Sequence, residues 1–254
     1  MSSDDVRIEV NGHGADEAAV SLLAHEGWGH FTAMQVRGGR ARGLGLHVAR
    51  LEAAHREIYR RALDGEEVHG RIRHALGGQP DASVRVYGYW AGLIVTVRGP
   101  QDMPRRPHTM RSLHFQRPLA RLKHVGSWGQ GRFREAALAA GFDEGLLVDE
   151  EGRISEGTIT NVGFWRGGTV MWPDAPKLPG ITMLLLRRQL TAVGIPQAEA
   201  PVRLQDLASY QGMILCNSHG WAPVNRVDEL MIPQDEAFTD IIAAAIDRCR
   251  WDEI

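Results

Sequence analysis

Residues 156–161 read EGTITN and combine a carboxylate, a glycine and three polar side chains in a single short turn. Lys123 lies upstream of this segment in the run ARLKHV, and the run LPGIT occupies residues 178–182 downstream of it. An amphipathic helix is expected over residues 182–193, and the free N–H groups at a helix start can hold an anion. In chain order, the three segments therefore supply an amine, a carboxylate near the end of a strand and an anion site.

These three groups meet the needs of an aldehyde cofactor that carries a ring nitrogen and a phosphate. A lysine amine condenses with the aldehyde into a Schiff base, an acid partners the ring nitrogen, and helix N–H groups hold the phosphate. Pyridoxal 5′-phosphate (PLP) is such a cofactor. Each group also has an ordinary interpretation: Lys123 as a surface lysine, Glu156 as a solvated hairpin carboxylate, and Gly180 to Thr182 as a plain helix cap.

Further segments accompany the three along nearly the whole chain, in this order: VNG at 10–12, GWGHFT at 27–32, HVARL at 47–51, GFDE at 141–144 and CNS at 216–218. The ordered set resembles the fold type IV, class IV PLP enzymes, which include branched-chain aminotransferases, D-amino acid aminotransferases and aminodeoxychorismate lyase. The resemblance implies a mixed α/β (α+β) architecture, the two-domain D-amino acid aminotransferase-like fold. It has a small N-terminal α+β domain and a larger C-terminal α/β domain.

The resemblance also implies a role for each candidate residue. Lys123 would carry the Schiff base and then move a proton between the substrate α-carbon and C4′ of the cofactor. Glu156 would keep the ring nitrogen protonated. The guanidinium of Arg50 would pair with the phosphate. Other contacts with the cofactor or with its loops are expected from Thr158, Thr160, Asn161, Gly180, Ile181, Thr182, Asn217 and Ser218.

The resemblance is weaker where a substrate would bind. Arg98 stands at the position of an arginine that holds a substrate carboxylate in some family members, although residues 100–102 (PQD) depart from that neighbourhood. Trp28 and Trp128 are candidate pocket-wall residues, and Trp128 stands where branched-chain enzymes have a tyrosine. The sequence also has Gly163 where an aromatic residue is usual, Trp172 in place of a threonine and Met183 in place of a basic residue.

Composition limits the class of protein. The chain has 254 residues, of which 43% are hydrophobic, and a formal net charge of −2, so it can bury a large core and has no polyelectrolyte character. No binding to nucleic acid or membrane is expected. The two cysteines have no metal-site or disulfide spacing, and the acidic residues 1–5 do not resemble a secretory signal. A cytoplasmic protein without a metal site is expected.

Local patterns divide the chain into a small α+β domain at residues 1–104, a connection at 105–120 that is rich in proline and arginine, and a cofactor domain at 121–254. The scattered arginines in and beside the connection are interpreted as a solvated or interface strip: Arg105, Arg106, Arg111, Arg117 and Arg121. Strands are expected at 6–10, 31–37, 84–90, 93–97, 145–148, 153–155, 162–166, 169–172 and 213–216, and one within the connection around 110–115. Hairpin turns are expected at Gly38–Gly39 and Gly167–Gly168. Helices are expected from residue 47 and over 131–140, 182–193 and 238–249.

The preferred function is amino-group transfer between an amino acid and a 2-oxo acid by a homodimer. An aminodeoxychorismate-lyase-like enzyme that releases pyruvate is the alternative, because LKH at 122–124, FWR at 164–166 and ILCN at 214–217 resemble that branch. A third possibility, from another class, is a binding protein that kept the fold and lost catalysis.

Overall fold

The computed structural model describes residues 6–17 and 25–254, so the acidic residues 1–5 lie outside the described part. The chain forms two compact units. Unit 1 combines the chain up to Asp102 with Leu122–Gly126 and Arg250–Ile254, and unit 2 combines Met103–Arg121 with Ser127–Cys249. The units therefore differ from the expected division in that the segment around Lys123 belongs to unit 1, whereas residues 105–120 belong to unit 2.

Unit 1 is built on a seven-stranded sheet with the order β16-β4-β3-β5-β6-β1-β2. The strands are β1 (Arg7–Val10), β2 (His13–Gly14), β3 (His30–Arg37), β4 (Arg40–Arg42), β5 (Ala82–Tyr89), β6 (Gly92–Arg98) and β16 (Trp251–Glu253). All the pairings between these strands are antiparallel. The tight β3–β4 turn uses Gly38 and Gly39, whose φ angles of 56° and 74° match a hairpin turn of the primed type.

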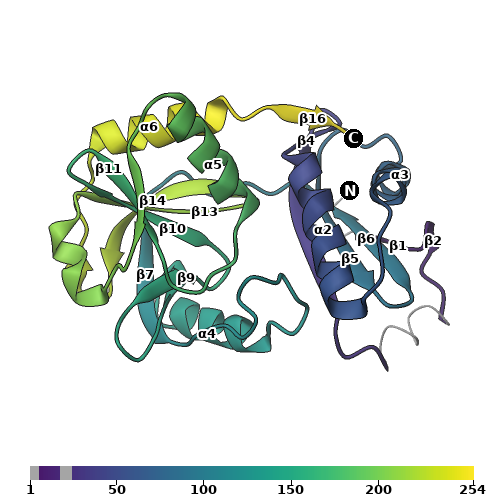
Figure 1. Cartoon of the computed structure of the whole chain (residues 1–254), viewed down its shortest axis with the longest axis horizontal. Coiled ribbons are helices and arrows are strands. Elements are labelled where there is room, and N and C mark those ends of the chain that lie inside the picture. Colours follow the sequence, from purple (N-terminus) through teal and green to yellow (C-terminus); the bar gives the residue numbers. More distant parts are fainter. Residues whose placement is uncertain (1–5, 18–24) are drawn as a thin grey trace. The chain divides into compact units, whose positions relative to one another are not determined.

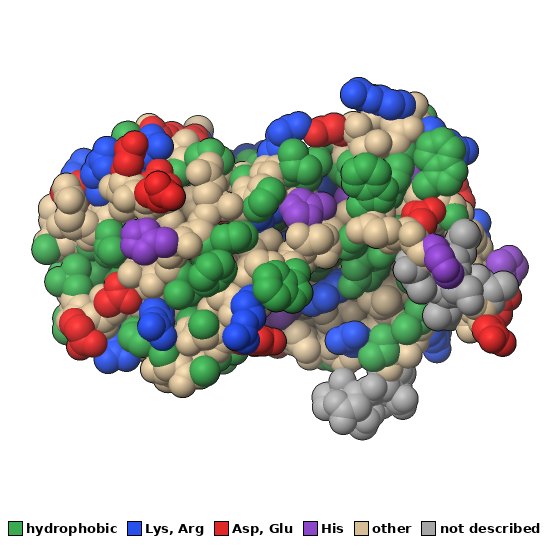
Figure 2. All heavy atoms as spheres, turned by 90° about the horizontal axis from the view of Figure 1, so that it is seen from below, with side chains coloured by type: hydrophobic (Ala, Val, Ile, Leu, Met, Phe, Trp, Pro, Cys, Tyr) green, Lys and Arg blue, Asp and Glu red, His purple; other side chains and the backbone are tan. Residues whose placement is uncertain are grey.

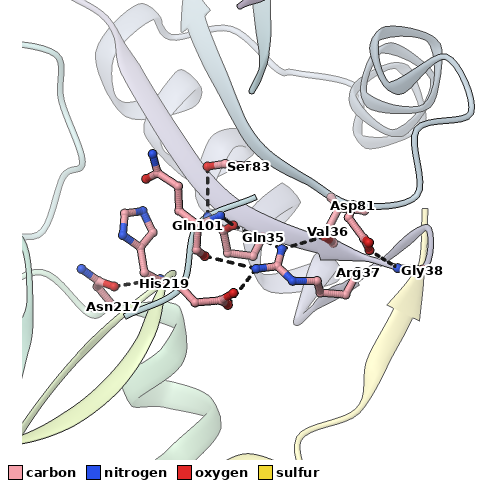
Figure 3. Close-up of polar contacts among 10 residues, drawn as sticks. Gln35, Val36, Arg37, Gly38, Asp81, Ser83, Gln101, Asn217 and His219 are labelled. Atoms are coloured by element: carbon pink, nitrogen blue, oxygen red, sulfur yellow. Dashed lines mark hydrogen bonds and ion pairs between the residues drawn. The ribbon is translucent and has the colours of Figure 1, made fainter. Parts of the chain in front are cut away.

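Two helices cover one face of this sheet. Helix α2 (Leu44–Tyr59) contacts β3, and α3 (Gly65–Leu76) contacts β6 and β1 (Figure 1). Alternate residues of β3, β5 and β6 point into the core between sheet and helices, which includes Met34, Val84 and Val95. The opposite face of β3 and β5 carries Gln35, whose amide donates to Ser83 Oγ at 3.0 Å (Figure 3).

Unit 2 contains a nine-stranded mixed sheet with the order β12-β11-β10-β13-β14-β7-β8-β9, and β15 pairs with β14. Its strands are β7 (His108–His114), β8 (Glu144–Val148), β9 (Ile154–Gly157), β10 (Asn161–Arg166), β11 (Thr169–Pro173), β12 (Gln197–Ala200), β13 (Gly212–Asn217), β14 (Gly220–Val227) and β15 (Leu230–Met231). The pairs β11–β12, β14–β7 and β7–β8 are parallel.

The central strands of unit 2 are buried on both faces. In β13, Met213 and Leu215 join one apolar core, whereas Ile214 and Cys216 join a second core beneath helices α5 (Ile181–Ala192) and α6 (Glu236–Asp247). These two helices pack against each other (Figure 1). Helix α4 (Trp128–Ala139) covers β8 and β7, and the short 3₁₀ helix η1 spans Leu204–Ser209. Double-sided burial explains the continuous apolar run in β13.

The departures at Gly163 and Trp172 explain each other. These residues lie on neighbouring strands, and a Cβ atom added to Gly163 would lie 2.7 Å from the Trp172 ring. The indole fills the space that a side chain at Gly163 would need, and its Nε1 donates to Gln197 Oε1 at 3.0 Å. Gly163 and Trp172 therefore depart from the family pattern together, because the small residue makes room for the large ring inside unit 2.

The expected elements occur with small shifts, and several further elements have no counterpart among the expectations. Helix α2 begins three residues before the expected start, and α4 begins at Trp128 rather than at Gly131. The sequence patterns did not predict helix α3, the 3₁₀ helix η1 or the strands β2, β4, β12, β14, β15 and β16. Within the described ranges, no helix is both long and apolar enough to cross a bilayer. Charged side chains of both signs are interspersed on the face seen in Figure 2.

Candidate active site

The Lys123 segment is attached to the first residues of β3 in unit 1. The amide of Phe31 donates to the Lys123 carbonyl at 2.8 Å, and the amide of Val125 donates to the Gly29 carbonyl at 2.9 Å. The half-buried Lys123 side chain extends over the Phe31 ring, with Nζ 4.8 Å from the ring centroid. Phe31 in turn stacks on Tyr87 at 5.4 Å between centroids. An aromatic platform therefore flanks the amine.

A buried histidine lies beside this segment. His47 on α2 is hydrogen bonded through Nδ1 to Thr32 Oγ1 on β3 at 2.6 Å. Burial, and then the positive charges of Arg50 and Lys123, lower the pKa of His47 from 6.5 to about 3. His47 is therefore a neutral ring in the neighbourhood of two cations. Arg50, the predicted phosphate ligand, belongs to the same α2 segment and is half-buried.

Glu156 is a buried residue of β9 in unit 2, not a solvated hairpin carboxylate. Its Oε1 atom accepts a hydrogen bond from Arg117 Nε at 2.9 Å, and both side chains are nearly inaccessible to solvent, at 4% and 5% exposed. The Arg117 guanidinium also donates to the Ala120 carbonyl. A carboxylate at this depth is retained in ionised form when a cation lies beside it.

The other Glu156 oxygen is bonded to the loop that leads into α5. The amide of Leu178 donates to Glu156 Oε2 at 3.1 Å. The carbonyl of Leu178 accepts from Asn161 Nδ2 at 2.8 Å and from the Gly180 amide at 2.8 Å. Residues at both ends of the EGTITN segment therefore hold the backbone N–H and C=O of Leu178, three residues before α5 begins.

The start of α5 has no side-chain cap. Its cap residue, Gly180, provides no side-chain hydrogen bond to the first turn, so the amides of the first helical residues, Ile181 and Thr182 among them, are not capped by it. The Thr182 hydroxyl donates to the Asn217 carbonyl at 2.7 Å. This bond joins the helix start to the turn after β13, where the Asn217 side chain accepts from the His219 amide at 2.8 Å (Figure 3). Ser218 lies in that same turn.

A second buried carboxyl lies beneath the EGTITN segment. Glu144 in β8 accepts hydrogen bonds from the Thr158 hydroxyl and, at 2.8 Å, from the Gly145 amide. Burial raises the pKa of Glu144, and these hydrogen bonds oppose the rise. The Thr160 hydroxyl is buried and has no hydrogen-bond partner among the described residues. A side chain at Gly157 would collide with that hydroxyl, which accounts for the glycine.

The candidate substrate residues are on the surfaces of their units. Trp28 in unit 1 is 72% exposed, and Trp128 at the first position of α4 in unit 2 is 80% exposed. Arg98 is an exposed residue at the end of β6. Cys216 is buried in β13, and burial raises the pKa of its thiol to about 12, as expected for a structural cysteine rather than a nucleophile.

Three contributors to these networks were not recognised from the sequence. Arg117 was grouped with Arg105, Arg106, Arg111 and Arg121 as a solvated or interface strip, and that interpretation is wrong for Arg117 because it is buried against Glu156. The other two are Glu144 and the amide of Leu178. A local pattern contains no signal for partners that lie 14 to 39 positions apart in the chain.

Comparisons with known proteins identify the family. The family model described as amino-transferase class IV matches residues 29–227. The chain belongs to the class IV aminotransferase family. This membership confirms the resemblance and the mixed α/β fold stated above, and members of the family use PLP as cofactor.

Individual relatives of this class IV aminotransferase chain span both reaction types. A probable branched-chain-amino-acid aminotransferase from Synechocystis is 26% identical over 113 residues, which are 43% of this chain and 37% of that protein. The 4-amino-4-deoxychorismate lyase from Pseudomonas aeruginosa is 27% identical, with 95% of this chain and 98% of that chain covered and a TM-score of 0.78. A PLP-bound hypothetical aminotransferase from Mycobacterium tuberculosis is 20% identical, with a TM-score of 0.80 and coverage of 96% and 100%.

The unit 2 network fits PLP. The cofactor needs an acid for its ring nitrogen and donors for its phosphate. The buried, arginine-paired Glu156 is such an acid, and the start of α5 supplies amides. The buried Thr160 hydroxyl without a partner is a further polar group that a ligand can satisfy. Within the described residues, no cluster of His, Cys, Asp and Glu has the composition of a metal site.

Proposed function

We propose that the protein is a PLP-dependent aminotransferase that moves an amino group between an amino acid and a 2-oxo acid, with Lys123 as the catalytic amine. The observation that carries this proposal is the buried Arg117–Glu156 pair joined through Leu178 to the start of α5. When bound, PLP supplies an aldehyde and a ring that accepts electrons released at the substrate α-carbon. The remaining chemistry belongs to residues of this chain.

Lys123 is the stronger of two candidates for the amine. The sequence contains two lysines, Lys123 and Lys177. Lys177 Nζ forms an ion pair with Glu199 at 2.6 Å and donates to the Pro173 carbonyl, so its protons are committed to structural partners. Lys123 lies beside the Phe31–Tyr87 platform and a neutral His47, a setting in which an amine can bind a carbonyl group and carry a proton.

The other proposed roles follow from chemical type. Glu156 would hold a proton on the ring nitrogen, with Thr160 and Asn161 shaping the same segment. Arg50 and the amides and hydroxyls of Gly180, Ile181, Thr182, Asn217 and Ser218 would bind the phosphate. Trp28, Trp128 and Arg98 would contact the substrate. A cytoplasmic homodimer is part of the same proposal.

A lyase that releases pyruvate is the second candidate, favoured by the 27% identity to the Pseudomonas aeruginosa lyase over 95% of this chain. A single-turnover experiment separates the two. PLP-loaded protein is mixed with one equivalent of an amino acid, and no 2-oxo acid is added. Transfer predicts stoichiometric 2-oxo acid and a stable absorbance change to the pyridoxamine form. Pyruvate release with the aldehyde absorbance retained would instead support the lyase.

The substrates of the proposed transfer can be found with a panel of L- and D-amino acids tested against two or three 2-oxo acids. The proposal expects at least one pair to support multiple turnovers. A binding protein without catalysis would be favoured by two results together. After addition of PLP, the purified protein would show no absorbance beyond that of free PLP, and borohydride would leave no covalent label on it.

A further inference from the structure

We propose that Arg117 is a positioning residue that keeps Glu156 ionised and fixes its orientation towards the cofactor ring nitrogen. The inference rests on the proposed function, because it assigns Glu156 to that nitrogen. It concerns a residue that the sequence patterns had placed on the surface.

The positive charge of Arg117 lies beside the buried Glu156 carboxylate. Both side chains of the pair are about 95% buried, and the pair is joined by an Nε–Oε1 hydrogen bond of 2.9 Å. A buried carboxyl without a cation takes up a proton, because burial disfavours its charged form. A protonated Glu156 could no longer accept a hydrogen bond from a protonated ring nitrogen at the same oxygen. The cation at Arg117 therefore sets the charge that this role requires.

Hydrogen bonds also hold the Glu156 carboxylate in one orientation. The Arg117 guanidinium is itself held, because it donates to the Ala120 carbonyl three residues further along the chain. On the other side, Glu156 Oε2 accepts from the Leu178 amide, and Asn161 fixes the Leu178 carbonyl. Arg117 and Leu178 thus bind different oxygens of one carboxylate, which leaves the carboxylate plane little freedom to rotate. The same contacts tie the carboxylate to the loop that opens α5.

The guanidinium of Arg117 suits this role better than an ammonium group would. A guanidinium keeps its charge at every physiological pH and presents donors in a rigid plane, so it can serve Glu156 and Ala120 at the same time. A lysine offers a single ammonium group and does not reproduce that fork. We therefore expect Arg117→Lys to restore part of what Arg117→Met removes.

The experiment measures PLP binding and its pH dependence in Arg117→Met, Arg117→Lys and the control Arg111→Met, which alters an exposed arginine of β7. Binding is followed by cofactor absorbance and by quenching of tryptophan fluorescence. In Arg117→Met we expect the dissociation constant for PLP to rise at least tenfold at pH 7 and to fall as the pH is raised, since Glu156 must then ionise without the charge of Arg117. Arg117→Lys should lie between Arg117→Met and the wild type, and Arg111→Met should match the wild type.

Urea unfolding of the cofactor-free proteins provides a readout that does not depend on PLP. Arg117→Met should be less stable than the wild type, and the double variant Arg117→Met/Glu156→Gln should recover part of the loss because it no longer buries a carboxyl that has lost the Arg117 charge. Strictly additive losses would mean that Arg117 acts by packing alone and would overturn the inference. Unchanged PLP affinity and pH profile in Arg117→Met would overturn it as well. Failure of the wild type to bind PLP would refute the proposed function instead.

Discussion

Thr32 and His47 are joined by a 2.6 Å hydrogen bond across the buried contact between β3 and α2. Both residues belong to segments that carry the family resemblance, but no local pattern indicates that they pair. His47 remains neutral in the folded protein, because burial and the charges of Arg50 and Lys123 lower its pKa to about 3. The threonine hydroxyl is therefore a polar partner of a buried neutral ring.

The first prediction concerns this bond. Thr32→Val keeps the side-chain shape and removes the hydroxyl, which leaves the His47 Nδ1 atom buried without its partner. Such a loss costs about 1–3 kcal/mol. Urea unfolding should show that loss for Thr32→Val, whereas the control Thr96→Val on β6 should stay within about 0.5 kcal/mol of the wild type. Equal stabilities for the two variants would show that the bond is not formed.

The second prediction concerns acid sensitivity. Burial, and then the charge of His55, lower the pKa of His30 from 6.5 to about 4. The unfolded chain binds this proton below pH 6.5 and the folded chain does not, so the free energy of unfolding should fall as the pH drops from 6.5 to about 4. The contribution of His30 reaches about 3 kcal/mol, from about 1.4 kcal/mol for each pH unit.

Histidine ring resonances in an NMR titration check this directly. The resonances that disappear in His30→Gln and His47→Gln should show no titration above pH 5 in the wild-type protein. His13→Gln, which replaces an exposed histidine of β2, is the control for the assignment of the resonances. A His30 midpoint near 6.5 would contradict the burial of its ring.

How far the sequence predicts this fold depends on whether the signal is local. Gly38–Gly39 and Gly167–Gly168 were predicted as hairpin turns, and all four glycines have positive φ angles. Helix α3 was not predicted, although Asp64 caps it and Val68 and Ile72 are buried on one face. Its many charged residues obscured a pattern that was present.

Other features lie beyond any local pattern. Strand β16 at the end of the chain pairs with β4 more than 200 residues earlier, as the Arg40–Glu253 ion pair also shows. The burial of Arg117 depends in the same way on Glu156, a distant partner. Tertiary contacts of this kind decide whether an arginine in a proline-rich stretch is solvated or buried. The segments that resemble the family motifs, such as EGTITN at 156–161, can in contrast be recognised from the sequence alone.

The third prediction concerns Glu144. Burial raises its pKa, so the folded state holds the proton more tightly than the unfolded state, whose carboxyl titrates near 4.5. This stabilisation is complete below the unfolded-state pKa and is lost as the pH rises through the raised value. Glu144→Gln keeps the acceptor for Thr158 and Gly145 but cannot ionise.

Unfolding in urea across a pH series tests the sign. The stability of Glu144→Gln relative to the wild type should increase with pH over that interval and then level off. Glu150→Gln, a change at an exposed turn position, should show no such trend. A difference between Glu144→Gln and wild type that does not vary with pH would show that Glu144 has the same pKa in both states.

The fourth prediction concerns the start of α5. A Cβ atom at Gly180 would collide with the Asn161 side chain, which must then release the Leu178 carbonyl. Gly180→Ala should therefore destabilise the protein by about 1–2 kcal/mol and weaken PLP binding. Gly131→Ala in α4 is the control, because nothing lies within 4 Å of the added atom, and it should stabilise by about 0.5–1 kcal/mol. If both variants behave alike, the close approach of Asn161 to Gly180 is refuted.

Covalent mapping shows whether Lys123 is the amine that binds PLP. PLP-loaded protein is reduced with borohydride, digested and analysed by peptide mass spectrometry, in the wild type, Lys123→Ala and Lys177→Ala. Because the chain has only these two lysines, the result is unambiguous. We predict one phosphopyridoxyl group on the peptide with Lys123, unchanged in Lys177→Ala and absent in Lys123→Ala. A label on Lys177, or a label that survives in Lys123→Ala, would contradict the account.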